Sequence, residues 1–278
     1  MAYQQHTITY QGRIVFIKLS MPGFDRTLKQ YVEDEACFMF VNNGEVAVRS
    51  QEDYFKLNRK KAMLAKCLNY FFEPTDDPDK CDDDIESVGI FLYPALVKEL
   101  FEFDLSSSSF TLDYNLKQIQ VDRLLENYRE SINILLDNPE LADEAIIKTK
   151  LKEFVLLMAK SQQAPSELDF LAALFKPNEV AFKTTIRHNL YANLSLEELA
   201  LLCHMSVSSF KRKFKAVFGE SPRKYIVKKK VERAAELLKA NDLRISDIAY
   251  EVGFDSLTTF NRNFANQYGK APSAYRLS

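Results

Sequence analysis

Two short runs of cationic and hydrogen-bonding residues lie fifty positions apart near the C-terminal end of the chain. They are Ser208, Lys211, Arg212 and Lys215 in the first run and Thr258, Asn261 and Arg262 in the second. At 3.6 residues per turn, each run falls on one face of a helix. Arg and Lys donate to guanine and Asn pairs with adenine, so such a face suits base edges in the major groove of DNA. A single polar face is more often merely solvated, and it is the occurrence in two copies that favours DNA readout.

An internal repeat contains both runs. The segment from Met205 to Tyr225 aligns, at an offset of fifty, with the segment from Asp255 to Tyr275. The identical pairs are Ser206 and Ser256, Phe210 and Phe260, Arg212 and Arg262, Phe214 and Phe264, Gly219 and Gly269, Pro222 and Pro272, and Tyr225 and Tyr275. A short amphipathic segment precedes each copy, the first of them behind a capping box of Ser195 and Glu198. Each copy is therefore predicted to be a helix-turn-helix, over residues 196–217 and 245–267.

A cluster of positive charge lies between the two copies. Ser221 and Pro222 predict the start of a helix over 222–240, because Ser caps helices and Pro is tolerated at the first position. Five cations crowd its first half, namely Arg223, Lys224, Lys228, Lys229 and Lys230. We expect this helix to hold the two readers about one DNA turn, roughly 34 Å, apart. Phosphate contacts are assigned to Arg223, Lys224 and Lys228.

The charge of the chain is divided between its two parts. The 278 residues carry a net charge of −2, which taken alone argues against nucleic acid. Residues 178–278 hold 17 Lys and Arg against 10 Asp and Glu, whereas residues 1–177 hold 20 against 29. Length and charge together predict two domains, an acidic one over 1–176 and a basic one over 177–278.

The apolar pattern of the acidic domain changes near residue 93. Residues 1–93 alternate in short apolar blocks, which predicts an antiparallel sandwich or barrel. The segment FMFVNNGEVAVRS predicts two strands joined as a hairpin at Asn42, Asn43 and Gly44. Residues 94–163 have a helical period, so the predicted fold class is α+β with an all-α C-terminal domain.

Two predicted helices in this region form a helical hairpin. The first runs from Leu116 to Asn138, and the second carries an apolar stripe of Ile147, Leu151, Phe154, Val155 and Met158. The stripe packs either on the sheet or on a second subunit. A homodimer through helices 116–160 is therefore one of two interpretations.

Few residues outside the repeat predict a reactive or metal-binding site. The run from Pro74 to Asp84 holds six aspartates without the Gly and Glu spacing of an EF-hand, so we interpret it as a solvated loop. The four cysteines lack paired spacing, which predicts reduced thiols in a cytoplasmic protein. Five phenylalanines are expected in the core rather than around a ligand, namely Phe38, Phe40, Phe55, Phe71 and Phe72. We expect no metal, no cofactor and no membrane span.

The C-terminal hundred residues resemble the DNA-binding domain of the AraC/XylS family of bacterial transcription regulators. The resemblance is carried by LSLEELALLCHMSVSSFKRKFKAVFGESPRKYI and ISDIAYEVGFDSLTTFNRNFANQYGKAPSAYR. It implies that the second helix of each unit enters the major groove. The base contacts it implies are Ser208, Lys211, Arg212 and Lys215, then Leu257, Thr258, Asn261 and Arg262. The helical wheel leaves Leu257 and Gln267 at the margin of the core face, and Leu257 suits a thymine methyl group.

The N-terminal domain resembles the cupin-like regulatory and dimerisation region of the same family. Metal-binding cupins use several histidines, and this half has only His6. The resemblance implies a cytoplasmic activator that binds double-stranded DNA, acts on RNA polymerase and is not an enzyme. Its effector is a small molecule or a protein. The alternative is a DNA-binding domain fused to an alkyl-transfer repair enzyme, which requires activated thiols.

Overall fold

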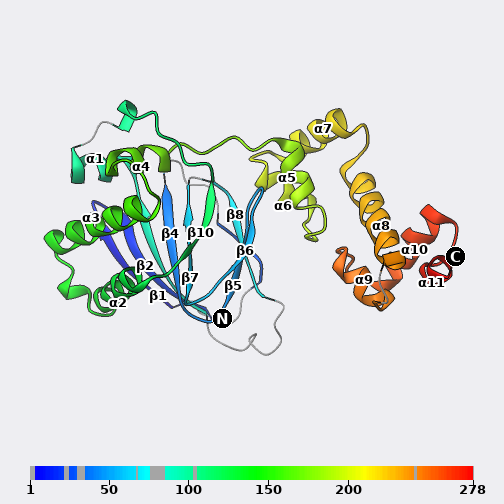
Figure 1. The fold of residues 1–278 in the computed structure, drawn as a ribbon, viewed down its shortest axis with the longest axis horizontal. Coiled ribbons are helices and arrows are strands. Elements are labelled where there is room, and N and C mark those ends of the chain that lie inside the picture. The colour runs from blue at the N-terminus through cyan, green and yellow to red at the C-terminus, as the bar shows by residue number, and fades with distance from the viewer. Residues whose placement is uncertain are drawn as a thin grey trace. The chain divides into compact units, whose positions relative to one another are not determined.

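The computed structural model describes residues 4–21, 25–29, 35–66, 68–75, 85–102, 105–240 and 243–277. The chain divides into two compact units, Met1–Glu179 and Val180–Ser278. The described strands all belong to the first unit, and the second is built from helices (Figure 1). The α+β fold class is therefore confirmed. The division falls after Glu179, where the sequence placed it after residue 176.

The described strands of the N-terminal unit form two antiparallel sheets. The larger has the order β1 (Gln4–Tyr10), β2 (Arg13–Met21), β9 (Ile85–Leu92), β4 (Ala36–Asn43), β7 (Lys61–Ala65) and β10 (Leu116–Gln120). The smaller has the order β3 (Thr27–Lys29), β8 (Tyr70–Glu73), β5 (Val46–Arg49) and β6 (Tyr54–Leu57). Apolar side chains from both sheets, among them Met39, Val48 and Tyr70, form a core between them. The predicted sandwich is therefore present.

The hairpin predicted at Asn42, Asn43 and Gly44 is wrong. β4 pairs with β9 and β7 in the larger sheet, while β5 pairs with β6 and β8 in the smaller one. Gly44 does adopt a positive φ of +79°, but its turn carries the chain from one sheet to the other. The reason is that β4 is buried on both faces, with Phe38 facing one core and Met39 the other. Such a strand belongs in the centre of a sheet with a neighbour on each side.

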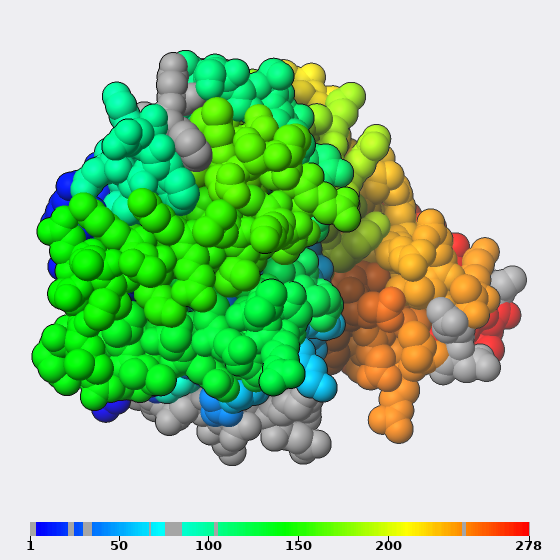
Figure 2. Space-filling view, turned by 60° about the vertical axis from the view of Figure 1, so that its left-hand side comes forward, coloured from blue at the N-terminus to red at the C-terminus, as the bar shows by residue number. Residues whose placement is uncertain are grey.

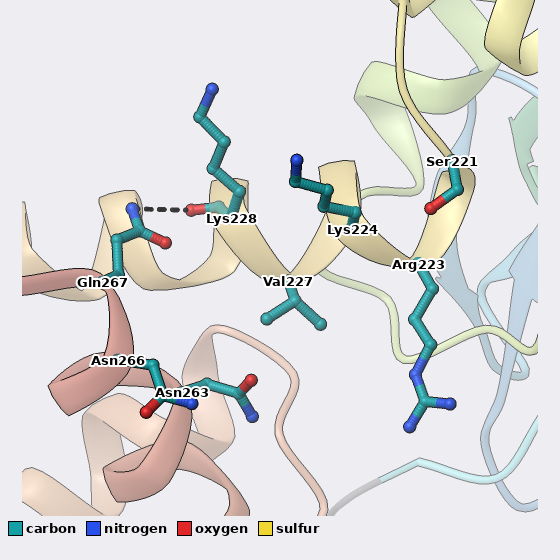
Figure 3. A pocket seen from close by; sticks show the side chains of 8 residues that line it. All are labelled: Ser221, Arg223, Lys224, Val227, Lys228, Asn263, Asn266 and Gln267. Atoms are coloured by element: carbon teal, nitrogen blue, oxygen red, sulfur yellow. Dashed lines mark hydrogen bonds between the residues drawn. The ribbon is translucent and has the colours of Figure 1, made fainter.

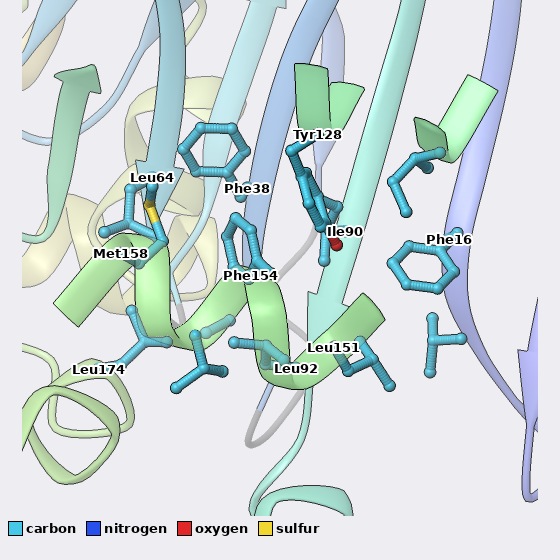
Figure 4. Close-up of a cluster of buried hydrophobic side chains, with 14 of the residues drawn as sticks. Phe16, Phe38, Leu64, Ile90, Leu92, Tyr128, Leu151, Phe154, Met158 and Leu174 are labelled. Carbon is cyan, nitrogen blue, oxygen red and sulfur yellow. The ribbon is translucent and has the colours of Figure 1, made fainter. Parts of the chain in front are cut away.

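Helices cover the other face of the larger sheet. They are α1 (Pro94–Phe101), α2 (Arg123–Asp137), α3 (Glu144–Ser161) and α4 (Glu167–Leu174), and Figure 2 shows their side chains, mostly green, over this face. All five residues of the predicted stripe on α3 are buried here. Phe154 meets Phe38 of β4 edge to face, with ring centroids 5.2 Å apart (Figure 4). The stripe thus packs on the sheet, which resolves the two interpretations in favour of the chain's own core.

The helix predicted from Leu116 starts too early. Residues Leu116–Gln120 form β10, and α2 begins after Asp122, whose side chain accepts a hydrogen bond from the Leu125 amide at 2.9 Å. Leu116 and Ile119 are three apart, a spacing that fits one helix face but also opposite faces of a strand. Here Leu116 faces the core between the sheets and Ile119 the core under the helices. The helical part also continues past residue 163, through α4.

Part of the aspartate run and two cysteines cannot be compared with the structure. Residues 76–84, including Cys81, and Cys67 lie outside the described residues. In the part of the chain that is described, no helix has the length and apolar character needed to cross a membrane.

The described residues of the C-terminal unit form seven helices. They are α5 (Phe182–His188), α6 (Leu196–Leu202), α7 (Val207–Phe218), α8 (Pro222–Ala240), α9 (Ile245–Glu251), α10 (Leu257–Tyr268) and α11 (Pro272–Arg276). One core gathers around Phe210 and Phe214 of α7, and another around Phe260 and Phe264 of α10. The two predicted helix-turn-helix units and the helix between them are therefore present.

Candidate nucleic-acid interface

The first helix-turn-helix unit consists of α6 and α7. The capping box predicted before α6 is formed, because the Ser195 amide donates to Glu198 Oε2 at 2.7 Å and the Glu198 amide donates to Ser195 Oγ at 3.1 Å. Ser206 caps α7 by accepting from the Ser209 amide at 3.3 Å. Gly219 ends α7 in the left-handed conformation, at φ +77°. Both ends of the reading helix are thus fixed by local chemistry.

The second unit, α9 and α10, repeats these caps. Ser256 accepts from the Thr259 amide at 3.3 Å, and Gly269 ends α10 at φ +73°. The turns differ by one residue, since α6 and α9 begin 49 positions apart whereas α7 and α10 begin 50 apart. His204 and Gly253, at φ +53° and +83°, are the corresponding left-handed residues, so Asp255 is the additional residue of the second turn.

Aromatic packing under the two reading helices is also repeated. Phe210 and Phe214 have ring centroids 5.7 Å apart, and Phe260 and Phe264 5.6 Å. The Tyr225 ring packs on Phe214 in the first set, with ring centroids 5.5 Å apart and an interplanar angle of 71°. The Tyr275 ring packs on Phe264 in the second set, with ring centroids 5.3 Å apart and an interplanar angle of 79°. The sequence repeat therefore corresponds to one packing unit built twice.

The residues assigned to base contacts share one property, which is exposure to solvent. They are Ser208, Lys211, Arg212 and Lys215 on α7 and Leu257, Thr258, Asn261 and Arg262 on α10. Leu257 is 37% exposed, and Gln267, which the helical wheel grouped with it, is exposed as well. None of the four cations on these faces has an ion-pair partner among the described residues. The α7 face thus combines three cations with a hydroxyl group, and the α10 face combines one cation with a hydroxyl and an amide group.

A groove lies between the first half of α8 and one flank of α10. Its volume is about 580 Å³, and its lining is Ser221, Arg223, Lys224, Val227, Lys228, Asn263, Asn266 and Gln267 (Figure 3). Gln267 Nε2 donates to the Lys228 carbonyl at 3.5 Å. All three residues assigned to phosphate contacts line this groove and are exposed. The amides of α10 were missed from the sequence, because only the packing of α8 against α10 makes their flank part of a groove.

Two of the five cations in the first half of α8 are not available in the same way. Lys229 Nζ donates to Glu232 Oε2 at 2.7 Å, and this bond raises the pKa of Lys229. Lys230 is only 8% exposed, and its Nζ donates to the Gly253 carbonyl at 2.5 Å. The sequence placed Lys230 among the five cations that crowd this half of the helix but did not assign it a phosphate contact, and the structure buries it.

Comparison with known proteins bears on both units. Residues 199–278 match a helix-turn-helix domain family, and residues 36–170 match the ExsA N-terminal regulatory domain. The chain is 36% identical over 91 residues to the MmsAB operon regulatory protein of Pseudomonas aeruginosa, which covers 33% of this chain and 30% of that protein. It is 31% identical over 151 residues to the virulence regulon transcriptional activator VirF of Yersinia enterocolitica, which covers 54% of this chain and 56% of that one. The chain belongs to the AraC family.

A solved structure of ToxT from Vibrio cholerae is also similar to this AraC-family chain. The TM-score is 0.39 at 14% identity, over 96% of this chain and 99% of that one. The sequence matches are shorter than this structural match. The chain spans only about a third to a half of the length of the two curated relatives.

Neither described cysteine of this AraC-family chain has the chemistry of a nucleophile. Burial raises the pKa of the Cys37 thiol to about 11 and that of Cys203 to about 12. A reactive cysteine needs a lowered pKa so that it is a thiolate at neutral pH. In addition, the described residues hold no group of three or more His, Cys, Asp or Glu side chains arranged for a metal ion. The alkyl-transfer alternative therefore finds no activated thiol at Cys37 or Cys203.

The N-terminal unit of this AraC-family chain has small apolar cavities between its sheets. Two adjoining cavities of about 160 and 90 Å³ share Leu19, Lys29, Met39, Phe72 and Ser87 in their linings. Of the five phenylalanines expected in the core, Phe38, Phe40 and Phe71 are buried, while Phe55 and Phe72 are half-buried. Core packing is thus the main role of these rings, and Phe38 and Phe72 also line cavity wall.

Proposed function

We propose that this chain is a sequence-specific DNA-binding transcription regulator that places α7 and α10 in two successive segments of the major groove. The observation that carries the proposal is the pair of equivalent exposed faces, whose cations, three on α7 and Arg262 on α10, have no ion-pair partner among the described residues. Base contacts come from the residues assigned above, of which Arg212 and Arg262 are the strongest candidates for guanine. Arg223, Lys224 and Lys228 bind phosphates beside them. The name of VirF supports an activator, which would act on RNA polymerase.

The N-terminal unit controls the DNA-binding unit and takes part in self-association. Its match to a regulatory domain supports the first role. The second is supported by large apolar side chains on the outward faces of α2 and α3, where Leu124, Ile134, Ile146 and Leu156 are 37–62% exposed. Exposed apolar side chains on adjoining helices are typical of a protein interface. An effector that binds this unit would act through it.

Selection of DNA by the purified full chain tests the proposal. Random-sequence duplexes are enriched by binding, and the selected duplex is then titrated beside a scrambled one at several salt concentrations. We expect strong preference for the selected duplex and a steep loss of affinity with salt. Equal affinity for both duplexes at every salt concentration would contradict sequence-specific binding.

Arg212→Ala tests the assignment of base contacts within the same assay. Loss of a bidentate guanine contact costs about 1–3 kcal/mol and relaxes the preference at one base step. Lys213→Ala is the matched control, because Lys213 is exposed on the same helix but its ammonium lies 5.0 Å from the Phe182 ring, off the reading face. It should weaken binding to the selected and scrambled duplexes alike. Equal behaviour of the two variants would remove Arg212 from the base contacts.

A further inference from the structure

The two helix-turn-helix units do not share a hydrophobic core. Within the described residues, the first core takes Tyr225 and Ile226 from α8, and the second takes the apolar residues of α8 from Val227 onward. No side chain belongs to both cores. Apolar packing therefore holds each unit on α8. The angle between the two units depends on α8 itself and on polar contacts where the units meet.

One buried charge lies at this junction. The Lys230 ammonium donates to the Gly253 carbonyl at 2.5 Å and lies 5.8 Å from the Phe254 ring centroid. Burial lowers the pKa of Lys230, and the negative charge of Asp255 opposes that shift. A buried ammonium needs hydrogen-bond acceptors, so the turn of the second unit is where this side chain is held.

The first unit reaches the same turn. A Cβ atom on Gly253 would lie 2.6 Å from the Tyr191 carbonyl oxygen and 3.0 Å from Lys230 Nζ. Tyr191 belongs to the loop between α5 and α6, so this loop, α8 and the second turn meet at Gly253. Asn193 of the same loop donates through Nδ2 to Asp255 Oδ1, and Asp255 is the additional residue of the second turn.

We propose that Lys230 is a positioning residue that fixes the angle between the two helix-turn-helix units, so that α7 and α10 meet DNA as one rigid reader. The Asn193–Asp255 bond supports the same angle from the other side of the turn. A fixed angle makes the second helix enter the groove as an intramolecular event at high effective concentration. The inference rests on the proposed function, because it assigns a role within DNA binding.

Lys229 provides a matched control on the same helix. It carries the same charge and precedes Lys230 by one residue, but it pairs with Glu232 within α8. Lys230→Met keeps the apolar stem and removes the donor, and Lys229→Met removes one charge without touching the turn. Asn193→Gly removes the second tie and keeps the positive φ of +51° that Asn193 adopts.

The experiment uses the full chain and three duplexes. The first is the duplex that the wild-type chain selects, the second has one of its two segments scrambled, and the third has one base pair inserted between the segments. We expect Lys230→Met to lose about tenfold in affinity for the selected duplex and less than about twofold for the one-segment duplex. The inserted base pair should weaken binding by the wild type but make little difference to the variant. Asn193→Gly should shift binding in the same direction by less, and Lys230→Arg should restore part of the loss.

Each other outcome has a distinct meaning. Equal losses on the selected and one-segment duplexes overturn the inference, since general misfolding gives that result. Identical behaviour of Lys230→Met and Lys229→Met overturns it as well. A wild-type chain that does not distinguish its selected duplex from a scrambled one overturns the proposed function itself, which separates that failure from the failure of the positioning role.

Discussion

His204 lies in the turn between α6 and α7, where the residue is exposed but partial burial of its imidazole lowers the pKa below the ordinary value of 6.5. The unfolded chain then binds a proton more readily than the folded chain does. As pH falls through about 6.5 toward the lowered pKa, this residue reduces the free energy of unfolding, and above about 6.5 the full stability is present. We predict that Tm falls more between about pH 7 and about pH 5 for the wild type than for His204→Asn. Asn tolerates the positive φ of +53° at this position.

His188→Gln is the control for this pH dependence, because it removes another exposed histidine of the same unit, at the end of α5 and away from the turn. If His204→Asn loses as much Tm as the wild type on acidification, the turn histidine is not the cause.

Single residues were predictable where the helix itself decides their surroundings. The outward positions of Lys211 and Arg212 follow from the inward positions of Phe210 and Phe214 on the same helix, so a helical wheel predicts them. Lys228 and Lys230 look alike in the sequence, yet one is exposed and the other is 8% exposed. That difference is made by Gly253, twenty-three positions away, whose missing side chain leaves the space for the ammonium group. No pattern local to α8 contains this information.

At the scale of elements, the repeat was the most reliable signal. The two reading helices end at Phe218 and Tyr268, one residue past the expected ends of their units, because glycines at 219 and 269 fix these ends locally. The strands were harder to predict, since alternation of apolar residues indicates a strand but not the strand with which it pairs. The crossing at Gly44 and the strand at Leu116–Gln120 were both decided by pairing with distant strands.

The two faces of α3 give a prediction at this scale. Leu151 is fully buried on the sheet, whereas Leu156 is 44% exposed. Leu151→Ala should lower the free energy of unfolding by about 2–5 kcal/mol, because it leaves a cavity in the core. Leu156→Glu should change it by less than about 0.5 kcal/mol but weaken self-association, because it puts a charge on the outward apolar face. Urea unfolding measures the first effect and sedimentation equilibrium the second. A Leu156→Glu chain with unchanged association would exclude this face of α3 from the interface.

At the scale of the whole molecule, the net charge of −2 is the sum of an acidic part and a basic part. The cations assigned to phosphates lie together along the first half of α8, so the salt dependence of binding should be governed there. Neutralising Arg223, Lys224 and Lys228 together, as R223Q, K224Q and K228Q, should lower the slope of log affinity against log salt by about three, roughly one for each lost phosphate contact. The preference for the selected over the scrambled duplex should remain, because phosphates carry no base identity.

Lys152→Gln with Lys160→Gln is the comparison for this slope, since both lysines are exposed on α3 of the N-terminal unit. They change the total charge in the same direction, so an effect of net charge alone would lower the slope for this pair too. An unchanged slope for the α3 pair beside a reduced slope for the α8 triple would assign the phosphate contacts to the C-terminal unit. A slope reduced by about two for the α3 pair would instead mean that net charge, or contact of the N-terminal unit with DNA, contributes to binding, and the division of charge between the two parts would then not divide their roles.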